Sequence, residues 1–202
     1  MPGIEHRLIH LFAIAPLALW AQVPLPIPDT LSGSSINLTV QEGTWEFHAG
    51  EMVNTYGYNG DLLGPTLLLE QGGTVTLNVT NALPDLTTTH WHGLHVSAEN
   101  DGGPHSLIYP NTTWSPSFTV LDRASTFWYH PHGHGLTDYQ VSKGAAGMII
   151  VRDAQEAALD LPRTYGVDDI PLILQTKAIV GGQIALHTGL DSVVMVNGAR
   201  GA

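Results

Sequence analysis

The sequence contains no cysteine and few basic residues. Without cysteine, disulfides, thiolate catalysis and thiolate metal sites are excluded for this chain. Only 7 Lys and Arg stand against 18 Asp and Glu, which gives a formal net charge of -11. Because nucleic-acid phosphates are bound by clustered cations, this balance indicates that no nucleic acid is a partner. An acidic surface suits an extracytoplasmic protein that meets cationic metal ions.

The first 21 residues have the pattern of a secretory signal peptide. The short segment Met1–Arg7 precedes the apolar run Leu8–Ala21, which is too short to span a bilayer. Pro16 lies inside this run and weakens the alternative of a buried amino-terminal helix. No twin-arginine pair is present, so the general export route is expected. We therefore predict a secreted or periplasmic protein without a membrane span in its mature form.

The rest of the chain is rich in turn formers, with 22 Gly and 13 Pro. Between the turns lie short runs of the kind that form β-strands, several of them alternating apolar and polar residues. These runs are Ile36–Val40, Thr74–Val79, Phe118–Val120, Ser125–His130 and Met148–Val151. Many short strands separated by Gly and Pro turns predict an all-β sandwich or small barrel.

The strand pattern indicates two domains of unequal completeness. One β-sandwich is expected over residues 22–153. A linker follows at residues 154–163, where Ala154–Leu161 has helical character and Pro162 ends it. A second domain is expected over residues 164–202, with a strand signal at Pro171–Gln175 and a hairpin turn at Gly181-Gly182. It has too few strands to close a core, so we expect an incomplete second domain that belongs to a longer protein.

Six of the 11 histidines lie in two short segments. His90 and His92, and likewise His130 and His132, stand two residues apart, so each pair would share one face of a strand. On adjacent strands these pairs would present four imidazoles to one small volume. Both lie beside aromatic residues of a kind usually buried, Trp91, Trp128 and Tyr129. An all-imidazole set favours copper or zinc, and a chance surface pair is the weaker interpretation.

The other histidines are expected to face solvent or to support the cluster from outside. His95 comes three residues after His92, so on a regular strand it would point to the opposite face. His134 follows Gly133 in a turn, and His105 lies in a loop after Pro104. Isolated histidines and those in the predicted signal peptide receive no role: His48, His187, His6 and His10.

Asp101 has two interpretations. It lies in the segment Asn100–Pro104, and Asp and Gly are common turn residues. A carboxylate at this place could also hydrogen-bond a metal ligand or a metal-bound water. Spacing alone does not separate the two.

Four motifs, taken together, identify a family. They are YGYNGDLLGPT at Tyr56–Thr66, HWHGL at His90–Leu94, DGGP at Asp101–Pro104 and WYHPH at Trp128–His132. In this combination the chain resembles the first cupredoxin domain of multicopper oxidases, in particular bacterial copper-efflux oxidases and laccase-like relatives. The resemblance runs from about Thr44 to Gln175 and continues weakly into Val194–Gly198, which is similar to the opening of the family's second domain.

The resemblance implies a cupredoxin-like Greek-key β-sandwich, followed by the truncated start of a second cupredoxin domain. It further implies that His90 binds the type 2 copper, and that His92, His130 and His132 bind the paired type 3 coppers. Asp101 would relay protons beside them. Members of the family oxidise a reducing substrate one electron at a time and reduce dioxygen to water at the clustered coppers. His95 stands where some relatives carry an acidic residue, and no role is implied for it.

The chain matches half of the trinuclear copper ligands of that family. The remaining ligands come from a carboxy-terminal cupredoxin domain, and the type 1 copper requires a cysteine that this chain lacks. We therefore expect the chain alone not to be an oxidase. The favoured interpretation is the amino-terminal part of a longer secreted oxidase. The alternatives are a stand-alone extracytoplasmic copper-binding protein, or a subunit that completes its site with a partner chain. The substrate stays open between phenols, cuprous ion and other metals.

Overall fold

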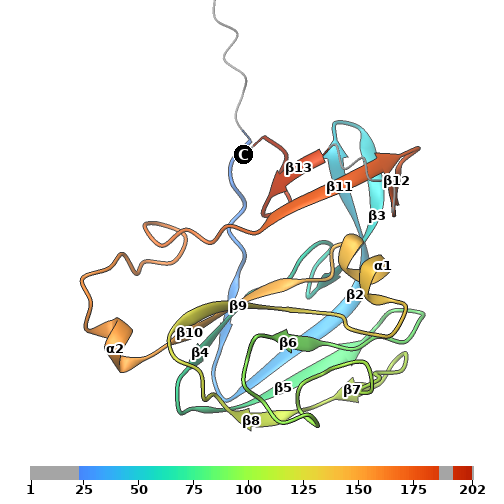
Figure 1. Cartoon of the computed structure of the whole chain (residues 1–202). Helices are drawn as coiled ribbons and strands as arrows, with labels where there is room; N and C mark the ends of the chain where they lie inside the picture. Colours follow the sequence, from blue (N-terminus) through green and yellow to red (C-terminus); the bar gives the residue numbers. More distant parts are fainter. Residues whose placement is uncertain (1–22, 187–192, 202) are drawn as a thin grey trace, which may run out of the picture.

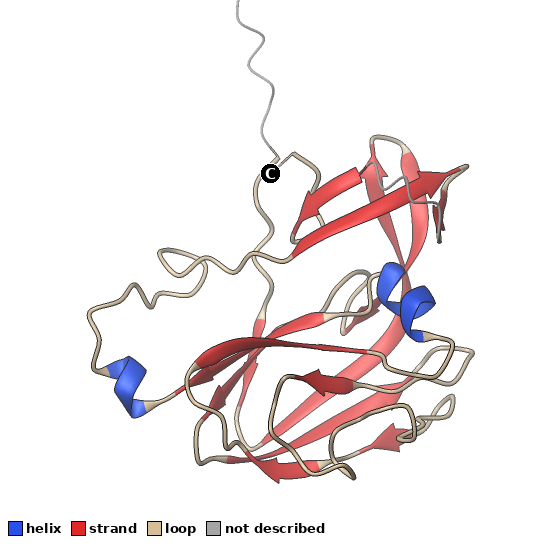
Figure 2. Cartoon of the chain, viewed as in Figure 1, coloured by secondary structure: helices blue, strands red, loops and turns tan. Residues whose placement is uncertain are grey.

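The computed structural model describes residues 23–186 and 193–201 of the chain. Strands make up most of the regular structure there, with two short helices at the margins (Figure 2). The predicted signal peptide and His187 lie outside the described residues. The strands are β1 (Thr30–Ser32), β2 (Ser35–His48), β3 (Glu51–Tyr58), β4 (Thr66–Glu70), β5 (Thr74–Asn81), β6 (His90–His92), β7 (Thr113–Trp114), β8 (Ser117–Thr119), β9 (Ser125–His130), β10 (Gly147–Arg152), β11 (Leu174–Val180), β12 (Gln183–Ala185) and β13 (Val193–Val196). The helices are α1 (Thr137–Ser142) and α2 (Ala154–Ala157).

Two sheets form the main body, as the strand pattern predicted (Figure 1). The first has the strand order β1-β4-β10-β9-β6, and the second has the order β3-β2-β5-β7 with β8 also paired to β5. Both sheets mix parallel and antiparallel pairs: β4 and β10 run parallel, as do β2 and β5, whereas β9 pairs antiparallel with both β10 and β6. Neighbouring strands are often distant in sequence, which is the crossover pattern of a Greek-key sandwich. The all-β, cupredoxin-like fold is thereby confirmed.

One apolar core lies between the two sheets. Alternate residues of β2 point inward, so that Ile36, Leu38 and Val40 are buried while their neighbours are more exposed. They pack in one cluster with residues of the opposite sheet, among them Leu67 of β4 and Ile149 of β10. The aromatic residues Trp91 and Tyr129 complete this cluster and are fully buried. The core therefore reaches directly beneath the strands that carry the histidine motifs.

A smaller sheet with the order β12-β11-β13 lies beside the sandwich, near the end of the β2–β3 hairpin (Figure 1). Its inward residues Val193 and Met195 pack against Phe47 of β2 and Val53 of β3. Gly181-Gly182 forms the turn between β11 and β12, as predicted. The small sheet thus buries its apolar face against the first sandwich, and in the described residues it has no separate core of its own.

Two expected elements are shorter than the sequence indicated. Helix α2 ends at Ala157, whereas helical character extends to Leu161. The strand signal at Pro171–Gln175 becomes a strand only at Leu174, where the chain can pair with β13. Pro171 lacks an N–H, and the Ile173 N–H donates to the Asn197 side chain rather than to a strand. Within residues 23–186 and 193–201, no helix is long and apolar enough to cross a membrane.

A histidine cluster as candidate metal centre

The pairing of β6 with β9 brings three of the predicted ligands together. His90 lies opposite His130, and His92 lies opposite Trp128, in an antiparallel register. The intervening pair, Trp91 and Tyr129, points into the core and is fully buried. Because side chains alternate along a strand, the histidines stand on the opposite face of the sheet, away from the core. The apolar pair therefore fixes which face carries the imidazoles.

His132 joins these three although it lies beyond the end of β9. Its ring centroid is 5.2 Å from that of His90 and 5.8 Å from that of His130. His90, His92 and His130 are 5.4–5.5 Å apart by the same measure. One potential ligand atom from each of these last three lies within 4.8 Å of the others. The structure thus brings all four predicted ligands into one cluster of rings.

Hydrogen bonds from the ring nitrogens define which atoms of the cluster can bind a metal. Nδ1 of His90 lies 2.9 Å from the Asp101 carbonyl oxygen, and Nδ1 of His130 lies 2.8 Å from the Pro131 carbonyl oxygen. A carbonyl oxygen only accepts, so both Nδ1 atoms carry the proton and both Nε2 atoms are unprotonated in the neutral ring. Nδ1 of His92 faces Nε2 of His130 at 3.2 Å. The potential ligand nitrogens of His90, His92 and His130 therefore point toward one small volume.

His130 is neutral at physiological pH. Burial lowers the pKa of His130 most, the hydrogen bond to the Pro131 carbonyl opposes this shift, and the three neighbouring imidazoles add to it, so that the net pKa is about 4. A neutral imidazole is the form that ligates metals. The donor set therefore fits copper, for which imidazole is a suitable ligand in both common oxidation states.

The Asp101 carboxylate lies beside the cluster. Its Oδ2 is 3.1 Å from Nδ1 of His90, and its backbone carbonyl accepts from the same nitrogen. The next residue, Gly102, presses against the preceding strand segment, since a Cβ there would lie 1.7 Å from the Thr89 carbonyl oxygen. Only glycine permits this approach. Asp101 thus belongs to a tight turn, and that turn places its carboxylate beside His90.

The outer histidines lie on the surface, as expected. His95, His105 and His134 are all exposed. The reason given for His95 was wrong, because β6 ends at His92 and strand alternation does not extend to it. Its Nδ1 instead lies 2.6 Å from Oδ1 of the buried Asp122, whose Oδ2 accepts from the His95 backbone N–H. Nothing in the sequence pattern indicated this pair.

Trp128 lies beside the histidine cluster, although its aromatic side chain was expected to be buried. It is 38% exposed rather than buried. Its indole stacks on the ring of His130 and lies 5.1 Å from that of His92. Strand alternation could have found it, since Trp128 and His130 are two residues apart on β9 and must share a face.

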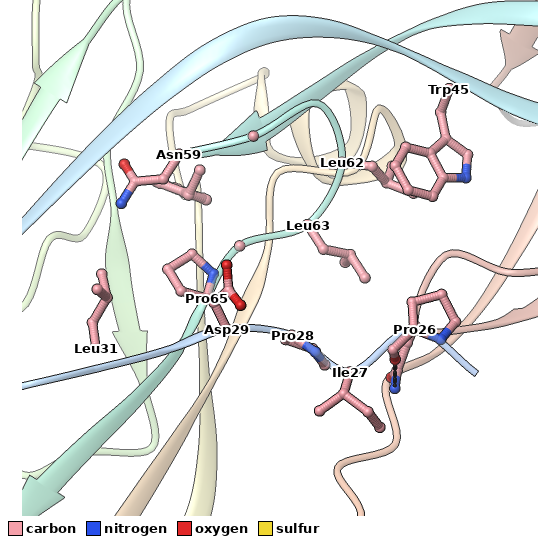
Figure 3. Close-up of a pocket in the computed structure, with 14 residues that line it drawn as sticks. Pro26, Ile27, Pro28, Asp29, Leu31, Trp45, Asn59, Leu62, Leu63 and Pro65 are labelled. Atoms are coloured by element: carbon pink, nitrogen blue, oxygen red, sulfur yellow. Dashed lines mark hydrogen bonds between the residues drawn. The ribbon is translucent and has the colours of Figure 1, made fainter. Parts of the chain in front are cut away.

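A cavity of about 250 Å³ lies elsewhere in the molecule, between the amino-terminal segment and the loop after β3. Figure 3 shows Pro26, Ile27 and Pro28 on one side of it and Leu63 and Pro65 on the other. Its lining includes none of the clustered histidines. This cavity is therefore separate from the candidate metal centre.

The fold and the cluster together define a cupredoxin-like domain that carries a group of imidazoles able to hold a metal ion. Residues 39–156 match the family model described as multicopper oxidase. The chain is 38% identical over 179 residues to multicopper oxidase mco of Staphylococcus aureus, covering 86% of this chain and 40% of that protein. It is 37% identical over 161 residues to cell division protein FtsP of Escherichia coli K12, covering 78% and 34% of the two chains.

Solved structures of multicopper oxidases have the same fold as this chain. A laccase-like multicopper oxidase, CueO, from Ochrobactrum sp. superimposes with a TM-score of 0.82 at 39% identity, covering 88% of this chain and 42% of that one. A laccase from Pediococcus acidilactici gives 0.84 at 34% identity, covering 89% and 42%. The chain belongs to the multicopper oxidase family. It spans about two fifths of the length of these relatives.

Proposed function

We propose that this chain supplies half of the ligands of a trinuclear copper centre, through His90, His92, His130 and His132. The observation that carries the proposal is the convergence of these four rings, with centroid separations of 5.2–5.8 Å, from two motifs on adjacent strands. By the family's pattern His90 serves the type 2 copper, and the other three serve the type 3 pair. In the complete enzyme, the bound coppers would supply the one-electron chemistry that couples substrate oxidation to the reduction of dioxygen to water.

The residues of this chain hold the ligands in the form that such a centre requires. The carbonyl oxygens of Asp101 and Pro131 keep the protons of His90 and His130 on Nδ1 and leave Nε2 unprotonated. The Asp101 carboxylate, 3.1 Å from His90, is placed to pass a proton between solvent and the cluster. It is only partly buried, which gives it access to water.

The chain has no cysteine for a type 1 copper, and by the family's pattern the trinuclear centre needs further histidine ligands. We propose a carboxy-terminal cupredoxin domain as their source, on the same longer chain or on a partner. The relatives support this, since each is more than twice as long as the matched part. The exposure of His92 leaves the cluster open on one side, where such a domain could dock. Export by the signal peptide at residues 1–21 would place the protein outside the cytoplasm.

A measurement of copper binding distinguishes this proposal from a function that needs no metal. One relative bears the name of a cell division protein, so likeness of sequence does not by itself assign oxidase activity. The full chain, prepared without metal, is titrated with Cu(II) and followed by electron paramagnetic resonance. We expect binding with nitrogen hyperfine structure, and loss of that signal in His90→Ala and His130→Ala.

The matched control is His105→Ala, which removes an exposed histidine from a loop that follows Asp101. We expect it to bind copper as the unaltered chain does. Copper uptake that survives both cluster substitutions, or that His105→Ala lowers equally, would place the metal elsewhere. A cluster that takes zinc but gives no copper signal would overturn the copper assignment.

A further inference from the structure

The position of His132 has a different origin from that of the other three candidate ligands. The ladder between β6 and β9 fixes His90, His92 and His130, and it ends at the pair His90–His130. His132 follows Pro131, which has no N–H with which to extend the ladder. Its ring centroid nevertheless lies 5.2 Å from that of His90. An interaction other than strand pairing must hold it there.

Thr88 provides that interaction. The backbone N–H of His132 donates to the Thr88 hydroxyl oxygen at 2.7 Å. Thr88 is fully buried, so water cannot readily replace it as the acceptor. It stands two residues before His90 in the chain. One short segment therefore carries both a candidate ligand and the acceptor that ties the second motif to it.

The neighbouring threonines are equally buried and make different bonds. Thr87 donates through Oγ1 to Gln140 of α1 at 2.8 Å, and the Oγ1 of Thr89 is 3.0 Å from the Tyr58 hydroxyl. Neither side chain contacts a histidine through these bonds. Thr88 is thus distinguished from its neighbours by its partner, not by its burial.

We propose that Thr88 is a positioning residue for copper: its hydroxyl oxygen holds His132 at the separation from His90 that the metal centre requires. The inference rests on the proposed function, because the relative position of two imidazoles matters when both bind metal. A ligand on an unanchored segment must lose conformational freedom when it binds, which weakens binding. The hydroxyl removes that cost in advance.

The test compares Thr88→Val, Thr88→Ser and Thr87→Val with the unaltered full chain. Valine matches threonine in shape but lacks the acceptor, whereas serine keeps it. Two quantities are measured: the exchange rate of the His132 amide by nuclear magnetic resonance on the metal-free chain, and the Cu(II) dissociation constant by competition with a chelator. Thr87→Val controls for the loss of a buried threonine bond that does not reach a histidine.

We expect Thr88→Val to accelerate exchange of the His132 amide and to weaken copper binding roughly tenfold, the effect of losing about one hydrogen bond. Thr88→Ser should restore both, and Thr87→Val should change neither. Unchanged copper affinity in Thr88→Val, or an equal loss in Thr87→Val, would overturn the proposal. So would a His132 amide that exchanges in the unaltered chain as fast as an exposed loop amide, a result that needs no variant to fold. Failure of the unaltered chain to bind copper would instead refute the proposed function.

Discussion

The indole of Trp128 stacks on the imidazole of His130, with ring centroids 3.9 Å apart and planes inclined by 23°. Both side chains project from β9 on the face that carries the histidines. His130 is buried beneath this stack, while Trp128 itself is 38% exposed. The stack therefore holds the ring of a candidate ligand in one plane.

Removing this stack should weaken copper binding without unfolding the domain. Aromatic stacking contributes about 0.5–1.5 kcal/mol beyond burial, so Trp128→Ala is expected to raise the Cu(II) dissociation constant by about two- to thirteenfold. Trp128→Phe keeps an aromatic face over His130 and should bind nearly as the unaltered chain does. Chelator competition measures both constants. If the two variants bind copper equally well, the stack does not position His130.

A substitution beneath the same strand should act on stability. A Cβ at Gly147 of β10 would lie 2.2 Å from Cζ of Tyr129, whose ring is fully buried and whose hydroxyl donates to the Pro65 carbonyl at 2.8 Å. Overpacking of this kind costs about 1–3 kcal/mol, so Gly147→Ala should lower the free energy of unfolding by that amount in urea titrations. Gly60→Ala, where a Cβ meets no atom within 4 Å, is the control and should be nearly neutral. Equal stability of the two variants would contradict this packing.

Much of the fold and three of the four candidate ligands could be predicted because they follow from local periodicity. Strand alternation places His90 with His92 on one face, and the Ser125–His130 run coincides with β9. Their pairing then brings the two motifs together. The convergence of His90, His92 and His130 is therefore a consequence of two strands and one register.

The rest depends on contacts between segments that are far apart in sequence. His132 was placed by assuming that its strand continues, but β9 ends at His130, and the position of His132 depends on Thr88. The pair His95–Asp122 joins loops 27 residues apart. Likewise, the small sheet's Met195 packs against Phe47, which no linear pattern of the carboxy-terminal segment could indicate. Such relationships exist only once the sheets have formed.

Asn197 connects three segments at the junction with the small sheet. Its Nδ2 donates to the Pro26 and Pro171 carbonyls at 2.7 and 2.8 Å, and its Oδ1 accepts from the Ile173 N–H at 2.7 Å. The bond to Pro26 is drawn beside the cavity in Figure 3. Loss of these bonds in a buried site should lower the free energy of unfolding by about 2–3 kcal/mol.

The substitution that isolates these bonds is Asn197→Gly, because Asn197 has φ of 51° and glycine tolerates that conformation. Asn59 is a matched control, with φ of 56° and side-chain bonds that are exposed. Asn59→Gly should therefore cost clearly less in the same urea titrations. A larger effect at Asn59 than at Asn197 would show that the junction does not depend on this side chain.

Asp153 should make part of the stability dependent on pH. Its carboxylate accepts from the Ala124 N–H at 2.8 Å and from the Glu156 N–H at 2.7 Å, the latter at the start of α2. These bonds, with that to Ala124 the stronger influence, lower the pKa of Asp153. A carboxyl whose pKa is lower in the folded state stabilises that state above its unfolded pKa of about 4, and this contribution is lost as the pH falls through the folded value.

Asp153→Asn removes the titrating group while keeping an oxygen that can accept one hydrogen bond. We expect the unaltered chain to be more stable than Asp153→Asn between pH 5 and 7, and the difference to shrink as the pH is lowered below about 4. Urea titrations of both chains across this range measure it. A stability difference at Asp153 that is constant from pH 3 to 7 would mean that the charge of the carboxylate does not contribute, and that only the shape of the cap matters.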